Sequence, residues 1–225
     1  MSPLAVSLTT ASAATAICCV FGIPLAHRLA RPAASNRLLE FLVHLPLVLP
    51  PTVVGWMLVL LLGRGSGFGR WLVDDLGVRL LFSWPALTMA SAVLAMPLFV
   101  RSAAAGLAAV DDDLRDSARI AGAGDWQLWW HVVRPLAWHG IAGGAALAFG
   151  RSLGEFGAAL MVGGQIPGKT ESLAIALWSA METGDTAGAA RSAWLLGLCG
   201  GLVNLGVVAT GNGMGWPTRR GFVAK

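Results

Sequence analysis

An all-α membrane protein, folded as a bundle of five transmembrane helices, is the fold class that this sequence predicts, and three observations predict it. Hydrophobic residues make up 56% of the 225 residues and charged residues only 12%, whereas a soluble domain carries about 25% charged residues. The mean hydropathy is +0.67. Five apolar stretches reach the roughly 20 residues that a helix needs to cross a bilayer. With so few charges the chain cannot cover a globular surface, so we expect it to lie in a membrane.

The five stretches follow one another along a single predicted transmembrane domain, residues 1–225. Their approximate limits are 4–29, 41–63, 84–110, 136–162 and 193–213. Another apolar run, residues 172–181, is too short to cross and suits a helix that lies on the surface or dips partway into the membrane.

Glycines recur at four-residue spacing in the last two stretches, which places each pair on one face of a helix. The pairs are Gly140/Gly144, Gly150/Gly154 and Gly197/Gly201. Because helix backbones approach closely where side chains are missing, we interpret the pairs as packing positions within the bundle, with a dimer seam as the alternative.

The basic residues of the loops predict the orientation, since cytoplasmic loops carry an excess of Lys and Arg. With the N-terminus outside, nine basic residues face the cytoplasm, five face outward, and Arg101 and Arg151 lie within spans. The nine include Arg219, Arg220 and Lys225 after the last span. We therefore expect the N-terminus outside and the C-terminus in the cytoplasm.

Residues 163–170 read GGQIPGKT, which matches the phosphate-binding loop G-x-x-x-x-G-K-T letter for letter. That loop needs a preceding strand and a following helix. Here the residues before it end a membrane helix, and Lys169 falls on the outer side. We therefore interpret GGQIPGKT as a Gly/Pro turn at a helix end and expect no nucleotide there.

The most polar internal segment is residues 111–135, between the third and fourth stretches. It can form two short helices broken at Gly122–Gly124. The acids Asp111–Asp113 suit a helix N-terminus, and Trp126, Trp129 and Trp130 are spaced to form one aromatic face. On physical grounds the segment is equally an amphipathic loop with Trp at the lipid headgroups or a docking surface for a soluble partner.

A resemblance to a known family favours the second alternative, that residues 111–135 dock a soluble partner. Permease subunits of ATP-binding-cassette importers carry a cytoplasmic signature of E-A-A, three residues, Gly, nine residues and I-x-L-P. This segment is similar to it, with Asp116-Ser117-Ala118, Gly122 and Val132–Pro135 at the family spacing. The resemblance implies a coupling loop that inserts a short helix into a cleft of the ATPase subunit. The coupling residues that it implies are Asp116, Ser117, Ala118, Gly122, Ala123, Gly124, Trp126 and Pro135.

Three further motifs resemble one branch of these importers. HLPLVLPPTVVGW at 44–56, RSLGEFGA at 151–158 and GAGDWQLWW at 122–130 look like the molybdate permease subunit, and the sulfate permeases share the general pattern. The resemblance implies the type-1 importer permease fold in the cytoplasmic (inner) membrane. It also implies a permease homodimer, two ATPase subunits that hold ATP and Mg²⁺, and an external substrate-binding protein.

Two groups of residues inside the predicted spans suggest a translocation path. His44, Pro46, Pro50 and Pro51 interrupt the second span, and proline breaks a helix by removing an N–H and clashing with the preceding turn. In the fourth span Arg151, Ser152 and Glu155 lie together, with the two charges four residues apart on one face. The pair either is a structural ion pair or lines the route of a tetrahedral dianion, molybdate or tungstate.

The sequence predicts a transport subunit without catalytic residues, cofactor or metal of its own, and without nucleic-acid binding. Two rivals remain. An ion-coupled carrier would show inverted repeats and paired intramembrane acids, but Glu155 is the single candidate acid and no repeat is evident. A non-transporting scaffold would not need the interrupted second span or the Arg151/Glu155 pair.

Overall fold

The computed structural model describes residues 1–31 and 36–211, with side chains up to residue 206, and throughout this part of the chain every regular element is helical. The elements are α1 Pro3–Leu29, α2 Arg37–Val48, α3 Pro51–Leu62, α4 Gly67–Arg70, the π-helical turn η2 Trp71–Asp75, α5 Trp84–Ala108, α6 Asp112–Ile120, α7 Asp125–Leu128, the π-helical turn η3 Trp129–Val133, α8 Arg134–Leu153, α9 Gly157–Gly163, α10 Leu173–Glu182 and α11 Thr186–Gly211.

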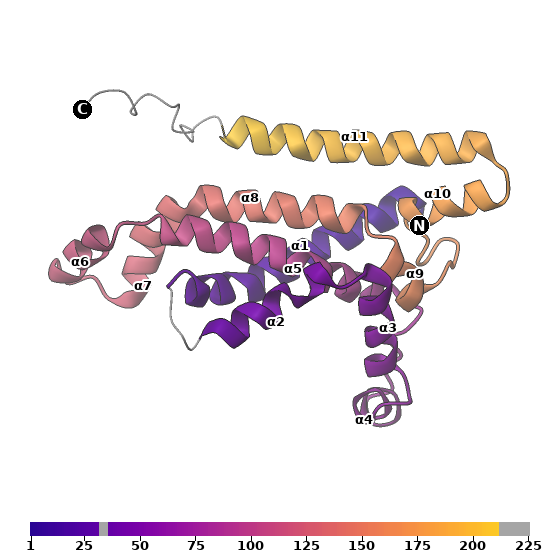
Figure 1. The fold of residues 1–225 in the computed structure, drawn as a ribbon, viewed down its shortest axis with the longest axis horizontal. Helices are drawn as coiled ribbons and strands as arrows, with labels where there is room; N and C mark the ends of the chain where they lie inside the picture. Colours follow the sequence, from indigo (N-terminus) through magenta and orange to yellow (C-terminus); the bar gives the residue numbers. More distant parts are fainter. Residues whose placement is uncertain (32–35, 212–225) are drawn as a thin grey trace.

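The core lies where α1, α5 and α8 run side by side (Figure 1). Phe99, Val100 and Leu107 of α5 are fully buried there. The backbones of α5 and α8 almost touch, since a Cβ on Gly140 would lie 2.6 Å from Gly106 Cα. The Ser102 hydroxyl also donates a hydrogen bond to the Gly140 carbonyl at 2.9 Å. The predicted packing role of Gly140 is thereby confirmed, and Gly144 packs in the same way against Phe99.

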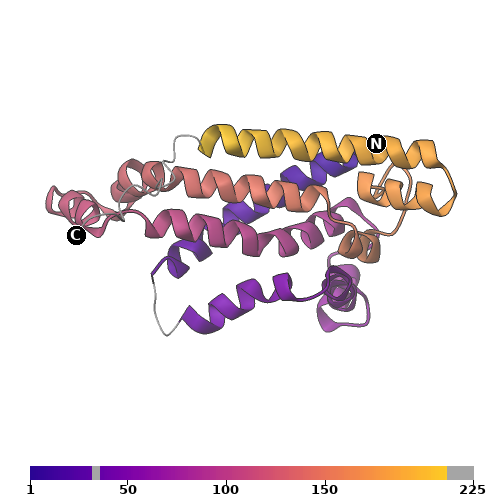
Figure 2. The same cartoon turned by 45° about the horizontal axis from the view of Figure 1, so that its top comes forward.

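The outermost helix is α11, which lies alongside α8 (Figures 1 and 2). Its exposed face carries a row of apolar side chains: Trp194, Leu198, Leu202 and Leu205. Gly197 and Gly201 are exposed, and a Cβ added at either would meet no other atom of the described chain within 4 Å. Their predicted packing inside this bundle is therefore wrong, because the other face of α11 makes the contacts, and the dimer-seam alternative stays a prediction.

Among the described residues, two unbroken helices are long and apolar enough to cross a membrane, α1 and α5, and there are up to four spans if each bent pair counts as one. The second predicted span divides into α2 and α3 with a bend of 112°, and the fourth divides before α9 with a bend of 62°. The fifth, 193–213, falls on α11 but runs two residues past the described residues. The count of five crossings stays a prediction.

Prolines explain the first bend. A residue that precedes proline is driven out of the helical region, and Leu49 and Pro50 have ψ angles of 141° and 137°. Pro51 then occupies the first position of α3, where its missing N–H is no loss. Pro46 behaves differently, because α2 runs straight through it. The break predicted at Pro46 is therefore absent, and so is any break at His44.

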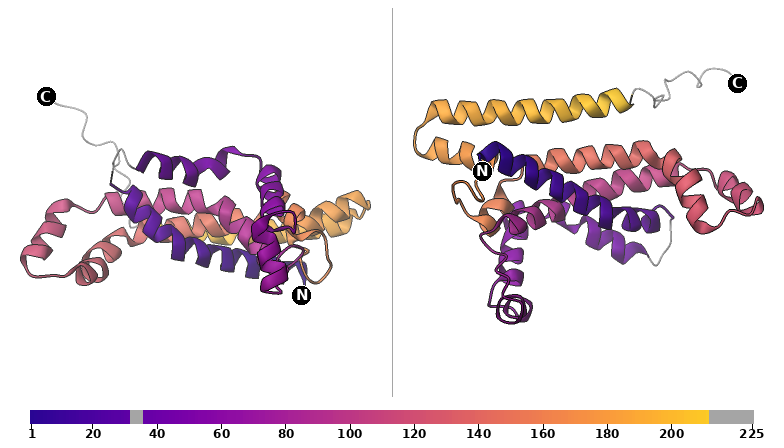
Figure 3. Two further views of the ribbon diagram at one scale, coloured as in Figure 1. Left: turned by 90° about the horizontal axis from the view of Figure 1, so that it is seen from below. Right: turned by 180° about the vertical axis from the view of Figure 1, so that it is seen from behind.

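The two ends of the bundle differ. The helices α6 and α7 lie at one end, and the N-terminus lies at the other, beside α9 and α10 (Figures 1 and 3). The Met1 amine donates to the Gly168 carbonyl at 2.8 Å, and the Leu173 N–H of α10 donates to the Ser7 hydroxyl at 2.8 Å. The short run predicted at 172–181 is α10, a helix of 10 residues.

Candidate functional site

The break between α2 and α3 packs directly against the break between α8 and α9. A Cβ on Gly55 of α3 would lie 2.8 Å from Ala158 Cα of α9, and a Cβ on Gly157 would lie 3.2 Å from Thr52 Cγ2. The same Gly157 position lies 3.4 Å from Pro51 Cβ. The fold thus brings the proline break of the second predicted span against the Glu155 break of the fourth.

Glu155 makes two bonds at this junction. Its Oε2 accepts a hydrogen bond from the Arg151 guanidinium at 2.6 Å, and its Oε1 accepts one from the Ala158 N–H at 2.8 Å. The Glu155 side chain is 2% exposed and that of Arg151 is 28% exposed. The carboxylate therefore joins the end of α8 to the start of α9, which supports the structural alternative for this pair.

Ser152 lies beside this pair and is also buried. Its hydroxyl contacts no hydrogen-bond partner within the described residues. In this conformation Ser152 and Glu155 are enclosed by protein, so a passing anion could reach them only after the helices around them move.

His44 and Pro46 lie further along α2 and do not join the break. His44 bonds through Nδ1 to the Glu40 carbonyl at 2.8 Å. It lines an open cavity of about 550 Å³ between α2 and α5. Pro46 lines a smaller apolar cavity of about 280 Å³ with Ile17 and Met96. The four residues predicted to interrupt the second span therefore belong to three separate places.

Arg101 is a candidate site residue that the sequence analysis placed in a span without giving it a role. It reaches the His44 cavity from α5, where Arg37 is also present. No carboxylate of the described residues pairs with Arg101. The sequence alone could have identified Arg101. A charged side chain inside an apolar span costs free energy, so such an arginine is by default a candidate functional residue.

Residues 111–135 form a helical elbow at the end of the bundle. Asp111 begins it by accepting the Asp113 N–H at 3.0 Å, as predicted for these acids. The helix α6 ends at Ile120, and the chain reverses through residues 121–124 into α7. At the reversal Gly122 has a φ of +88°, a left-handed conformation that favours glycine. The predicted pair of short helices broken at Gly122–Gly124 is present.

The elbow is attached to the bundle through Arg115. This side chain is 7% exposed, and its guanidinium donates to Asp112 at 2.9 Å and to the Leu107 carbonyl at 2.7 Å. The coupling residues named from the sequence lie mainly on the outside. Those that are exposed are Asp116, Ser117, Gly122, Gly124, Trp126 and Pro135, whereas Ala118 and Ala123 are half-buried.

The predicted single aromatic face is wrong for Trp129. Trp126 and Trp130 do pair, with ring centroids 5.2 Å apart, and the Arg134 guanidinium lies 4.4 Å over Trp130. Trp129 instead turns towards α1, where it meets His27 edge-on at 5.7 Å. The π-helical turn that begins at Trp129 has a wider i→i+5 step, which changes the angular order of the side chains.

The outer surface of the elbow is unusually apolar for a polar segment. Ile120 is 88% exposed, Trp126 is 72% exposed and Leu114 is 50% exposed. Ile120 and Leu114 did not stand out in the sequence. Exposed apolar side chains surrounded by charges are typical of a protein-docking surface.

The GGQIPGKT segment is a closed turn, as predicted. It follows the helix α9, with no strand before it. The Thr170 hydroxyl is fully buried, donates to the Gly163 carbonyl at 2.9 Å and accepts the Ile166 N–H at 3.2 Å. A threonine whose hydroxyl is bonded in this way cannot coordinate the Mg²⁺ of a bound nucleotide.

Comparison with known proteins agrees with this architecture. The family described as "Binding-protein-dependent transport system inner membrane component" matches residues 19–211. The molybdenum transport system permease protein ModB of Escherichia coli K12 is 41% identical over 187 residues, 82% of each chain. The sulfate transport system permease protein CysW of Synechococcus elongatus is 33% identical over 179 residues, 79% of this chain and 62% of that one. The fold also resembles the crystal structure of a bacterial ABC transporter that imports alginate, with a TM-score of 0.65, 15% identity, and coverage of 94% of this chain and 79% of that one.

The family match over residues 19–211 identifies the class of this chain as the membrane component of a transport system. The chain belongs to the family of binding-protein-dependent transport system inner membrane components, the permease subunits of ATP-binding-cassette importers. It is therefore a multi-pass inner-membrane transport subunit and not an enzyme, as the sequence analysis predicts.

Proposed function

We propose that this chain is the permease subunit that carries molybdate or tungstate across the inner membrane of an ATP-driven importer. The 41% identity to a molybdenum transport permease, over 82% of both chains, carries the proposal. In this proposal the bundle makes five crossings, with the N-terminus outside and the C-terminus in the cytoplasm. The N-terminus and the elbow lie at opposite ends of the bundle, which is consistent with that orientation (Figure 1).

The proposed assembly is a homodimer of this permease with two ATPase subunits and an external substrate-binding protein. The elbow supports the ATPase contact, because Ile120 and Trp126 offer apolar side chains to a partner at the end of the bundle. ATP and Mg²⁺ belong to the ATPase subunits.

The mechanism proposed is alternating access. ATP binding draws the two ATPase subunits together and displaces the elbows, and the bundle passes from an inward-open to an outward-open state. ATP drives this change only because it binds one state more tightly. The anion then passes along a route that must hold it weakly enough for release. The unpaired guanidinium of Arg101, in the cavity with His44, is suited to such a transient contact.

Sulfate is the alternative cargo of the same importer class, and the 33% identity to a sulfate permease is the observation behind it. Molybdate, tungstate and sulfate are all tetrahedral dianions, so the permease path would treat them alike and the binding protein would select among them. A less favoured alternative is a secondary carrier that works without an ATPase.

Reconstitution tests the proposal. Proteoliposomes that contain this chain, its ATPase subunit and its binding protein should accumulate labelled molybdate when ATP is present on the ATPase side. Vesicles that lack the ATPase should not. Uptake by the chain alone, driven by an ion gradient, would establish the carrier instead. Uptake of sulfate in preference to molybdate through the same complex would show that sulfate is the transported anion.

Arg101 gives a prediction about the path. Replacing it by Gln should lower molybdate uptake roughly tenfold, because a hydrogen bond to a charged group contributes about 1.5–3 kcal/mol. Arg101→Lys keeps the positive charge and should retain most of the uptake. Initial uptake rates in proteoliposomes measure both. Equal uptake by the wild type and by Arg101→Gln would show that Arg101 does not contact the transported anion.

A further inference from the structure

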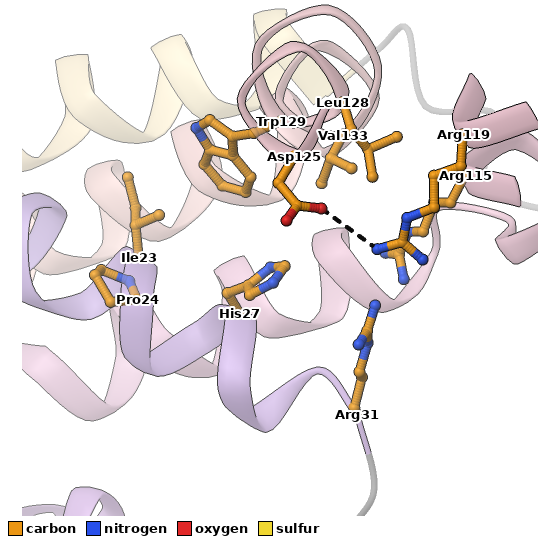
Figure 4. Close-up of a pocket in the computed structure, with 10 residues that line it drawn as sticks. All are labelled: Ile23, Pro24, His27, Arg31, Arg115, Arg119, Asp125, Leu128, Trp129 and Val133. Carbon is orange, nitrogen blue, oxygen red and sulfur yellow. Dashed lines mark ion pairs between the residues drawn. The ribbon is translucent and has the colours of Figure 1, made fainter. Parts of the chain in front are cut away.

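We propose that the permease binds an anionic phospholipid in a cavity between the end of α1 and the elbow. The cavity has a volume of about 580 Å³. It is lined by Ile23, Pro24, His27, Arg31, Arg115, Arg119, Asp125, Leu128, Trp129 and Val133 (Figure 4). The proposal requires that α1 crosses a membrane, but it does not depend on which anion the permease transports.

The cavity has one strongly cationic side. Arg31, Arg115 and Arg119 all line it, and Asp125 is the one carboxylate among its lining residues. In Figure 4 these guanidiniums border the same space as the Asp125 carboxylate. Arg115 is already paired with Asp112 at 2.9 Å. The surplus of positive charge therefore comes from Arg31 and Arg119, and arginine is well suited to bind phosphate oxygens.

The surplus is available to a ligand because the internal pairs are weak or incomplete. Arg119 lies 3.7 Å from Asp125 and 4.0 Å from Asp116, and both carboxylates are well exposed. Arg31 pairs with no carboxylate of the described residues. Arg115 is more than nine-tenths buried, yet its Nε lacks a hydrogen-bond partner among those residues. This Nε is itself buried, so in this conformation a phosphate in the cavity could not reach it, and the contacts to phosphate would come from Arg31 and Arg119.

The other side of the cavity is apolar. Ile23 and Pro24 come from the last turns of the apolar helix α1, and Leu128, Trp129 and Val133 come from α7 and η3. The apolar residues Ile23 and Pro24 precede Arg31 by about two turns of α1, so the wall becomes apolar towards the middle of the span. A free anion would use the cationic side alone, whereas a phospholipid would place its phosphate there and its first acyl carbons against the apolar wall.

The location fits a lipid of the leaflet on the elbow side. Basic pockets at the ends of transmembrane helices bind anionic headgroups, and the attraction is about 1 kcal/mol for each Lys or Arg near the surface. The bound lipid would join α1 to α6 and η3, which are elements of the bundle and of the elbow. The lipid would thereby stabilise the position of the elbow relative to the bundle.

The test uses the purified full-length permease in a neutral detergent and three added probes. These are short-chain phosphatidylglycerol, short-chain phosphatidylcholine and inorganic phosphate, with binding followed by native mass spectrometry and by the melting temperature. Phosphatidylglycerol should bind and raise the melting temperature, and the other two should not. Equal effects of phosphate would mean a site for free anions, and equal effects of phosphatidylcholine would mean apolar binding alone; either result overturns the proposal.

Variants locate the site. Arg31→Gln and Arg119→Gln alter exposed side chains, so the protein should still fold, and together they should weaken phosphatidylglycerol binding about tenfold or more. The matched control is Arg28→Gln, an exposed arginine in the last turn of α1, three residues before Arg31 and outside the cavity lining. The control should bind like wild type. Unchanged affinity in the double variant, or equal loss in Arg28→Gln, contradicts a site in this cavity.

Discussion

Replacing Glu155 by Gln should destabilise the permease severely, although the two side chains have nearly the same shape. Glutamine can still accept the Ala158 N–H, so the change removes the charge and leaves Arg151 without its partner. Loss of one member of a buried ion pair costs about 3–5 kcal/mol. Arg151 is 28% exposed, which places the expected loss near the lower value. The whole free energy of unfolding of a typical protein is about 5–15 kcal/mol.

The melting temperature of the purified chain and the yield of monodisperse protein measure this loss. The double variant Arg151→Gln/Glu155→Gln is the control, because it leaves neither charge unpaired and should recover most of the stability. Glu155→Ala also removes the cap of α9 and should lose about 1 kcal/mol more than Glu155→Gln. If Glu155→Gln melts like wild type, the ion pair does not hold the two helices together.

Replacing Gly122 by Val should separate ATP hydrolysis from transport. At a φ of +88° a β-branched residue is strained by about 1–3 kcal/mol. That strain lowers the population of the present turn roughly 5- to 150-fold. A Cβ at Gly122 would have no other atom within 4 Å, so the effect would come from backbone conformation and not from a clash. We expect molybdate transported per ATP to fall by a similar factor.

Gly77→Val is a matched control for this experiment. Gly77 also has a positive φ, of +67°, and open space around its Cβ position, but it follows η2 and lies outside the elbow. It should lose comparable local stability while transport per ATP is maintained. ATPase activity and uptake, measured on the same proteoliposomes, decide the outcome. Normal coupling in Gly122→Val, or equal uncoupling in both variants, would contradict a specific role for the elbow turn.

The sequence predicted features whose cause lies in a few neighbouring residues. The break before Pro51 follows from Pro50 and Pro51 themselves, because a residue that precedes proline is driven out of the helical conformation. The reversal at Gly122 and the acids that begin α6 are equally local. The turn at 163–170 was predicted because no strand precedes it.

Three features were missed, and one of them, the position of Trp129, depends on a tertiary contact. The break between α8 and α9 has no proline, and it is stabilised by the Glu155 carboxylate reaching the Ala158 N–H. Pro46 was expected to interrupt a helix that in fact continues. The inward turn of Trp129 depends on a π-helical turn and on His27, which lies about a hundred residues earlier in the chain. Hydrophobic periodicity contains none of this information.

The near-contact of α5 and α8 has a mechanical consequence. These two helices lead into and out of the elbow, and they are locked where Gly106 meets Gly140 and where Ser102 bonds to the Gly140 carbonyl. Because the two backbones are in near-contact at Gly106 and Gly140, sliding of one helix along the other would bring larger side chains into this contact. In the proposed mechanism, a displacement of the elbow would therefore move α5 and α8 together and reach Glu155 and α9, about 30 Å away along the 20 residues of α8.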